Sequence, residues 1–562
     1  MSSLVTTPRP LRRRACAALS LGAGLALALI PATIRAQVTL THTEDAAPVP
    51  TGVLRLRVTT GWSRIDERFT ATGRRSLSDE IATDSLGPRQ LPLLQPVESA
   101  LQALTSSTST RLTLGRLGAT SGARTVVTPI ALEYGLTRRL SVGLLIPIVQ
   151  TRRAIHVTVN DDTLHPANVS FVPSRLRSSA SQANAQVYTA FSRAADSLAT
   201  LLTRCPANPT ASGCATVNAN TADASATQLA ARRYADAVKS GLGTDTSTAL
   251  IAPRENSDLA KAIDAQRLAT NIRLQKYLGS NAGSGTGVFT SSSTFSYIDL
   301  QGRTPTPGLL RSALGGGLDS IQTIDRPGFL RGLSVAAQYL VFDGFRMDTV
   351  APGAFQSRLA VGGALRMGST PSDSGHKLGT IEPGRGSGFE LHSAMDFIRG
   401  NLGGTVALGL DVASPRTVDA SLYGDPEAYF SVPVFGSVTA TPGSIATLDV
   451  TPRYLIGDLF AIDGHYGLER TGATTLSPID AAPACAVCGS LSPVTGIPAR
   501  TAHRVGFGFR YSTVAAYERG DTGFPAEISF THLETISGDP GVAKVQRDQI
   551  QVRLFFRLRG SR

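Results

Sequence analysis

The sequence has few aromatic residues and little strongly hydrophobic character. Aromatic side chains make up 6% of its 562 residues, there is a single tryptophan, and the mean hydropathy is +0.03. A bundle of membrane-spanning helices needs stretches of about 20 apolar residues, whereas a disordered chain combines low hydrophobicity with high net charge. The composition fits neither class, which leaves a large fold of mixed polarity.

Basic clusters interleaved with aromatic residues, which would indicate nucleic-acid binding, are also missing after residue 36. The formal charge is +12. Removing the first 36 residues takes away five arginines and no acidic residue, which lowers this charge to +7. The remaining chain is only mildly basic, so we expect no nucleic-acid partner.

The first 36 residues have the features of an export signal. A basic start ending at Arg14 is followed by an apolar run from Ala15 to Ile30, and then by Pro31 and Ala36. About 16 apolar residues are too few for a membrane-spanning anchor, and a small residue at the expected cleavage site favours a signal peptide, residues 1–36. Cys16 lies at the start of the apolar run, not after it, so lipidation is not expected.

The exported chain would keep four cysteines in two close pairs. Cys205 and Cys214 form one pair, and Cys485 and Cys488 form the other. In an oxidising compartment, two local disulfides are the simplest interpretation. The second pair has the spacing of a redox or zinc half-site, but no second pair or adjacent histidine completes it, so we expect no metal and no cofactor.

Alternation of apolar and polar residues is the dominant pattern after the signal. At the C-terminus, Ile550, Val552, Leu554 and Phe556 alternate with polar neighbours over about ten residues. A strand of this kind has one apolar and one polar face, as membrane-spanning barrel strands have. Twelve such strands are predicted, near 53–62, 124–134, 139–148, 332–342, 356–366, 389–397, 405–412, 446–454, 460–469, 504–512, 524–533 and 549–558.

The links between these strands favour an all-β, antiparallel transmembrane β-barrel of about 12 strands. Short links near 135–138, 400–404 and 456–459 fit periplasmic turns, and the long links then all lie outside. Two further stretches, 111–117 and 429–438, allow an alternative with 14 strands. A soluble β-sandwich is the other interpretation, but rare lysine and many arginines on the polar faces favour a barrel with a wet interior.

One long loop interrupts the strands. The predicted barrel strands occupy residues 37–150 and 331–562, and residues 151–330 form an insertion whose segment 175–279 has a helical period. Helices are predicted up to Cys205, from Ala222 to Ser240, and from Asn256 or Ser257 to Gly279. The insertion is expected to be a small helical subdomain, and binding of a partner or membrane surface is the alternative.

Charged residues on the polar strand faces are candidates to line the barrel interior. These faces carry charges of both signs. Their inward placement is expected, because a charge facing lipid costs about 2–4 kcal/mol at the membrane midplane. These charges suggest either an arginine-biased conduit for anionic or amphiphilic solutes or a closed, salt-bridged interior. The candidate lumen residues are Arg453, Arg504, Arg510, Arg553, Arg557, Asp411, Asp449 and Asp463.

Catalysis has little support in the sequence. Four histidines, His392, His465, His503 and His532, lie on different predicted strands, and His392 and Ser393 point to opposite faces. Residues 384–388 are rich in glycine but lack the lysine and following helix of a phosphate-binding loop. We therefore expect no enzymatic activity.

Residues 129–147, PIALEYGLTRRLSVGLLIP, resemble the hairpin of outer-membrane barrels of the MetA-pathway phenol-degradation transporter type. The resemblance covers about twenty residues at the level of a motif. It implies passage of small, often hydrophobic molecules across an outer membrane, and it implies no catalytic residues. The chain departs from common barrel proteins in its last residues, Arg559–Arg562, which replace a terminal aromatic residue, and in its large helical insertion.

Two functional classes therefore stay open. The first is a passive channel or transporter for small hydrophobic or anionic solutes in the cell outer membrane. The second is a closed structural or surface-binding barrel that displays the helical insertion. The expected partners are outer-membrane lipid, the barrel assembly machinery and a small solute of unknown identity.

Overall fold

A computed structural model gives the fold of the chain. It describes residues 45–558 with gaps. The gaps are residues 81, 92–93, 162, 281, 297–298, 300–322, 331, 346–352, 368–385, 422–434, 480–494 and 522. The predicted signal peptide, its cleavage site after Ala36, the pair Cys485 and Cys488, and Arg559 lie outside the described residues.

Twelve antiparallel strands close into a barrel, as the sequence predicts. The strands are β1 (Val53–Thr70), β3 (Leu117–Gly135), β4 (Leu140–Val159), β8 (Leu333–Asp343), β9 (Gln356–Met367), β10 (Gly388–Arg399), β11 (Leu402–Ala413), β14 (Ile445–Ile456), β15 (Phe460–Thr471), β18 (Arg500–Ser512), β19 (Ala526–Gly538) and β20 (Ala543–Arg557). Each strand pairs with its neighbours in chain order, and β1 closes the barrel by pairing with both β3 and β20. The alternative with 14 barrel strands is wrong, because residues 111–116 form no strand and β13 (Phe435–Thr441) belongs to a separate sheet.

The alternation in sequence becomes a difference between the two faces of the barrel wall. On β20, Ile550 and Phe556 point outward and are exposed, whereas Gln551 and Arg553 point inward and are buried. The same holds on β18, where Phe507 and Phe509 are exposed on the outside. Because the side-chain period of a strand is two, the register places alternate residues of each strand on the same face of the wall. The barrel thus has an apolar outer surface, as a transmembrane barrel requires.

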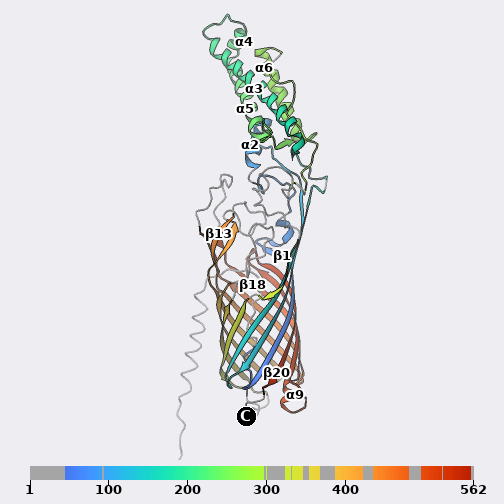
Figure 1. Ribbon diagram of the computed structural model, residues 1–562, viewed down its shortest axis with the longest axis vertical. Helices are drawn as coiled ribbons and strands as arrows, with labels where there is room; N and C mark the ends of the chain where they lie inside the picture. The colour runs from blue at the N-terminus through green and yellow to red at the C-terminus, as the bar shows by residue number, and fades with distance from the viewer. Residues whose placement is uncertain are drawn as a thin grey trace, which may run out of the picture.

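The two ends of the barrel differ in their connections. Short turns join β3 to β4, β10 to β11 and β14 to β15, and the last two contain Gly400 and Gly457 at positive φ of 57° and 64°. Glycine adopts this conformation without steric cost, which suits a tight turn. The C-terminus and the short helix α9 (Val514–Glu518) lie at this same end, and the helical insertion lies at the other (Figure 1).

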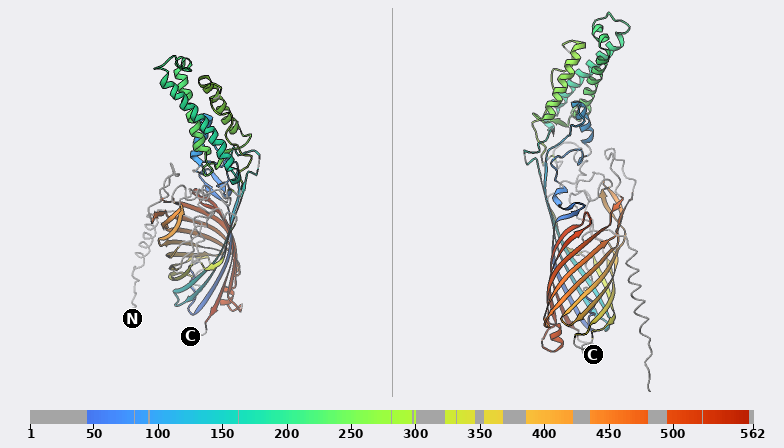
Figure 2. Two further views of the ribbon diagram at one scale, coloured as in Figure 1. Left: turned by 45° about the horizontal axis from the view of Figure 1, so that its top comes forward. Right: turned by 180° about the vertical axis from the view of Figure 1, so that it is seen from behind.

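The helical insertion forms a head at the end of the barrel far from the C-terminus (Figure 2). Its main helices are α3 (Arg177–Arg204), α4 (Cys214–Ala219), α5 (Thr221–Ala237) and α6 (Asp258–Leu278), which confirms the three predicted helices to within a few residues. The Ser257 hydroxyl accepts a hydrogen bond from the backbone N–H of Ala260, and α6 ends at Gly279 with φ of 85°. The predicted N-cap and stop are therefore confirmed.

One helix of the head was not predicted. Helix α2 (Gln95–Thr105) comes from the first long loop, and its buried face of Ala100, Leu101 and Leu104 joins the hydrophobic core of the insertion. Phe191 and Leu198 of α3 are fully buried in the same core. The head is thus built from two loops, which pack against each other through apolar side chains.

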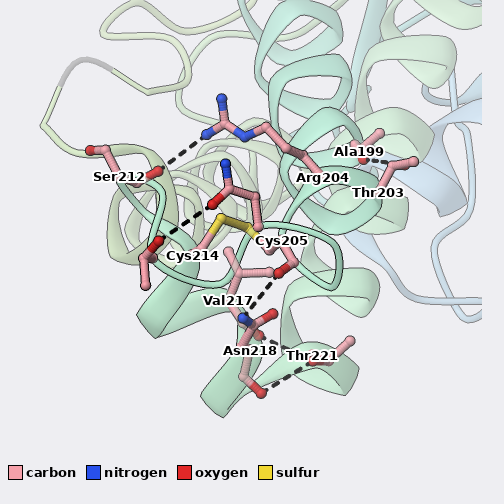
Figure 3. The surroundings of a disulfide bond; sticks show 11 residues. Ala199, Thr203, Arg204, Cys205, Ser212, Cys214, Val217, Asn218 and Thr221 are labelled. Atoms are coloured by element: carbon pink, nitrogen blue, oxygen red, sulfur yellow. Dashed lines mark hydrogen bonds between the residues drawn. A yellow bond between two sulfur atoms is a disulfide. The ribbon is translucent and has the colours of Figure 1, made fainter.

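A disulfide between Cys205 and Cys214 links the end of α3 to the start of α4, as predicted (Figure 3). The side chain of Asn218 donates a hydrogen bond to the carbonyl oxygen of Cys205, and Cys205 and Cys214 are both fully buried. The disulfide therefore holds together the two ends of the nine-residue connection between α3 and α4.

The strands that carry the head extend beyond the predicted ranges. β1 continues to Thr70 and pairs with β2 (Gly73–Ser76), and β3 and β4 remain paired as far as Leu117 and Val159. β7 (Thr323–Leu330) pairs with β4 beside β8. Two smaller sheets lie outside the barrel. They consist of β12 (Arg416–Ser421), β13, β16 (Thr474–Pro478) and β17 (Gly496–Ile497), and of β5 (Val169–Phe171) and β6 (Ile251–Pro253).

Within the described residues, no helix is both long enough and apolar enough to span a membrane.

Candidate functional site in the barrel interior

The inward-facing arginines of the barrel are held by carboxylates. The Asp463 carboxylate accepts a hydrogen bond of 2.6 Å from Arg453 on the neighbouring strand, and lies 3.5 Å from Arg510. Arg504 donates to Glu469 at 2.7 Å. These carboxylates are almost completely buried, with exposed side-chain fractions of 3% for Asp463 and 2% for Glu469. Charges this deep are stable only when paired, so the interior is built from ion pairs.

Asp411 is bound by an arginine two strands away. Both terminal guanidinium nitrogens of Arg366 on β9 donate to Asp411 on β11, at 2.8 and 2.9 Å. Between them on β10 lies Gly388, where a Cβ atom would come within 2.9 Å of the Arg366 guanidinium. The missing side chain at this position lets Arg366 reach across β10 in the two-bond geometry that favours arginine–carboxylate pairs.

Arg553 contacts two carboxylates near the end with short turns. It donates to Asp45 at 2.7 Å and lies 3.2 Å from Glu527. Glu527 also accepts a hydrogen bond of 3.0 Å from Arg510. The predicted residues Arg453, Asp463, Arg510 and Arg553 therefore belong to one chain of ion pairs, which Glu527 completes.

Three predicted positions differ from this pattern. Arg557 is exposed at the end of β20, and Arg139, at the start of the predicted strand 139–148, is exposed in the turn before β4. Asp449 faces inward on β14 as predicted, yet its side chain is exposed rather than buried. Arg557 keeps the inward face of β20 through its register pair with Val53, but both arginines lie at strand ends, where solvent reaches their side chains.

Residues 45–50 lie inside the barrel, a position that the sequence did not predict. The backbone N–H of Ala46 donates to Asp396 at 3.1 Å, and that of Val49 donates to the Ser141 hydroxyl at 2.9 Å. Ala46 and Val49 are 0% and 1% exposed. Nothing in the sequence before β1 has a strand or helix period, so only the tertiary contacts reveal this segment.

Asp45 fixes the start of this segment. Its carboxylate faces Arg553 and lies 3.9 Å from Arg55, and its carbonyl oxygen accepts a hydrogen bond of 3.0 Å from Gln338. Burial raises the pKa of Asp45, but the positive charges of Arg553 and Arg55 outweigh this and hold the pKa below its usual range. The arginines thus favour the ionised form of the Asp45 carboxyl.

The two sides of the interior differ in their access to solvent. Next to residues 45–50, the side chains of Arg57 and Arg553 are each 6% exposed. On the opposite wall the side chains of Arg453 and Arg504 are 21% and 23% exposed. Asp449 on this wall is exposed, and Gly467, which is opposite Asp449 in the register, has no side chain. Water therefore reaches the wall formed by β14, β15 and β18, whereas the wall beside β1 is filled.

A small polar cavity lies on the filled side. Arg55, Glu133, Gln338 and His392 line it, and within the described structure neither ring nitrogen of His392 has a hydrogen-bond partner. The nearest carboxylate oxygen, of Glu390, is 3.7 Å from His392 Nδ1. A cavity with several polar groups of this kind is suited to a bound water molecule.

Ion pairs with carboxylates neutralise the excess positive charge that the sequence predicted for the barrel interior. Eight inward arginines on the predicted strands contact carboxylates; they are Arg55, Arg57, Arg358, Arg366, Arg453, Arg504, Arg510 and Arg553. In the part of the chain with described coordinates, no group of His, Cys, Asp and Glu side chains could hold a metal ion.

No protein-family model and no curated protein matches the sequence. Among solved structures, an outer membrane channel from Pseudomonas putida F1 is similar over 92% of this chain and 100% of that chain, with 8% identity and a TM-score of 0.39. A Pseudomonas aeruginosa FadL homologue and the Pseudomonas putida toluene transporter TodX are similar at TM-scores of 0.26 and 0.23. Their identities are 9% and 8%, over 90% and 93% of this chain and 90% and 94% of theirs. Because these TM-scores are low, the evidence for the barrel is the strand pairing of this chain and not its similarity to the solved structures.

Proposed function

We propose that the protein is a narrow passive channel for small solutes in a bacterial outer membrane. The observation that carries this proposal is the exposure of Asp449 on the inward face of β14, opposite a wall that residues 45–50 fill. A hydrated strip of wall inside a closed barrel is a route for small molecules. The apolar outer face supports the membrane location.

The charge pairing supports small uncharged solutes as the class that passes. Because every inward arginine named above contacts a carboxylate, the interior offers polar groups without a field of one sign. We therefore expect weak selectivity between anions and cations. The hydrated strip is also narrow, since a twelve-stranded barrel with a filled wall leaves little free cross-section.

Planar-bilayer conductance and liposome swelling with a small sugar test the channel. Wild-type protein is expected to give small, infrequent current steps, and Asp45→Ala larger or more frequent ones. This variant removes the carboxylate that joins residues 45–50 to Arg553 and Arg55, so the segment loses an anchor inside the barrel. Asp521→Ala is the matched control, because Asp521 is 60% exposed and pairs with Arg519 outside the barrel.

Two results would overturn the proposal. One is the absence of both current and swelling in wild type and in Asp45→Ala. The other is an equal response of Asp45→Ala and Asp521→Ala, which would show that the passage does not involve the interior near Asp45.

A closed barrel that displays the head is the second candidate. It is supported by the disulfide-linked helical head, whose core is shared between two loops and which β3 and β4 hold beyond the barrel. An impermeable wild-type protein, with an impermeable Asp45→Ala variant, is the result that this candidate predicts.

A further inference from the structure

Three arginines form a row on the outer surface of the barrel. Arg64 of β1 is directly opposite Arg124 of β3, and Arg124 is directly opposite Arg152 of β4. All three are exposed. They share the strand face of Leu54, Leu132 and other outward apolar residues, whereas Arg55 and Arg57, on the other face, are buried in the interior. We call Arg64, Arg124 and Arg152 the arginine row.

The row lies at the upper edge of the apolar surface. Ten residues separate Leu54 from Arg64, and at about 3.3 Å per residue on a strand tilted by about 40° they rise about 25 Å along the barrel axis. This equals the height of about 25 Å that the apolar band of such barrels has. Trp62 and its cross-strand partner Val126, both exposed, lie directly below the row.

The position of the row corresponds to lipid headgroups at the end that carries the head. Tryptophan is enriched where apolar lipid meets the headgroups, and Trp62 is the single tryptophan of the chain. β3 and β4 continue from this level into the head, and the C-terminus and short turns lie at the other end (Figure 1). The row thus faces the leaflet on the side of the head.

The charges of the row favour a bound anion. Like charges directly opposite each other on adjacent strands destabilise a sheet, and Arg124 lies between two such neighbours. Asp66 pairs with Arg64 at one end of the row, and at the other end the backbone register places residue Asp325 of β7 opposite Arg152. A little higher, the exposed Arg75 is opposite Arg68 in the register and adds positive charge.

We propose that the arginine row binds the phosphate groups of a phosphorylated glycolipid in the outer leaflet of the membrane. Guanidinium groups bind phosphate through paired hydrogen bonds, and an anion between them replaces repulsion by attraction. The acyl chains of such a lipid then lie against Trp62, Val126 and the apolar surface below. The proposal depends on the outer-membrane location proposed above and is independent of channel activity.

Lipid binding to the purified full-length protein tests the proposal. The probe is lipid A with both phosphates, measured by native mass spectrometry and by retention in detergent. We expect R64Q/R124Q/R152Q to bind it at least about tenfold more weakly than wild type, because several charge-assisted hydrogen bonds are lost. The control R138Q/R470Q/R519Q removes the same charge from exposed arginines elsewhere and is expected to bind as wild type does.

Further measurements separate lipid from other anions and from a fold defect. Dephosphorylated lipid A should bind no better to wild type than to R64Q/R124Q/R152Q, and inorganic phosphate at the lipid concentration should not compete. Conductance and heat-dependent migration in gels should be unchanged in both triple variants, since none of these residues lines the interior. Equal binding of lipid A by wild type and R64Q/R124Q/R152Q, or competition by inorganic phosphate, overturns the proposal.

Discussion

At the scale of single residues, the interior of the barrel depends on ion pairs between strands. Arg453 and Asp463 are directly opposite in the register, whereas Arg366 crosses β10 to reach Asp411. A buried pair adds little stability compared with a well-packed apolar pair, but removing one partner leaves a buried charge without compensation. Single substitutions in this network should therefore be more harmful than double ones.

We predict that Asp463→Asn lowers the free energy of unfolding of the barrel by about 3–5 kcal/mol. Both Arg453 and Arg510 would lose a buried carboxylate. Equilibrium unfolding in detergent, followed by the loss of the fast-migrating folded band in gels, measures this change.

The double variant Arg453→Gln/Asp463→Asn is expected to recover part of this loss, because Arg510 keeps its bond to Glu527. Asp521→Asn, at an exposed position, is the control and should change the stability by less than about 0.5 kcal/mol. A loss in Asp463→Asn no larger than in Asp521→Asn would contradict the prediction.

At the scale of elements, the head obtains its stability from packing and from one covalent bond. The core unites α2 of the first long loop with α3, α5 and α6 of the insertion. Asp223 of α5 accepts hydrogen bonds from Lys276 and Tyr277 of α6, and the bond from Tyr277, followed by that from Lys276, lowers the pKa of Asp223. The side chains of Lys276 and Asp223 are 43% and 45% exposed, so solvent screens their ion pair, and the core and the disulfide are the larger contributions.

We predict that Cys205→Ser/Cys214→Ser lowers the stability of the head by about 2–3 kcal/mol. Closing a loop with a sequence separation of nine residues removes about that much chain entropy from the unfolded state. Thermal unfolding of the full chain, followed by the helical circular-dichroism signal, measures it.

The barrel provides an internal control for this prediction, because its β signal and its gel migration should melt as in wild type. Wild type under reducing conditions should match the double variant. A helical transition unchanged by both treatments would contradict the prediction.

At the scale of the whole molecule, the connections between strands indicate how the barrel is oriented in the membrane. The short turns and C-terminus lie at one end, and the disulfide-linked head lies at the other (Figure 2). In outer-membrane barrels the short turns face the periplasm. The head should therefore be outside the cell.

We predict that a protease site inserted between Ala207 and Ser212 is cut in intact cells. The loop is exposed and lies between the two bonded cysteines, so the fragments should separate only after reduction. The measurement is gel electrophoresis of whole cells with and without reductant.

The same site inserted after Gly400, in the short turn between β10 and β11, is the matched control. It should be cut only after the outer membrane is made permeable. Cleavage of the Gly400 variant in intact cells, with protection of the head, would reverse the orientation.

The sequence alone determined the strands and the helices of the insertion. The period of two set which face of each strand is apolar, and the short glycine-containing links set their order, so all twelve barrel strands were predicted. Ser257 and Gly279 marked the ends of α6 because caps act locally. Inward orientation was likewise predicted for Arg453, Asp463 and Asp411.

Only the tertiary structure decided what these side chains contact. The pairing of Arg366 with Asp411, the position of Asp45 inside the barrel and the place of α2 in the head all join residues far apart in the sequence. Such contacts depend on how the closed barrel brings separate segments together, and no local period records them. For the same physical reason, only the tertiary structure shows that the inward arginines predicted from the sequence contact carboxylates. It also shows that Arg64, Arg124 and Arg152, far apart in the sequence, form one row.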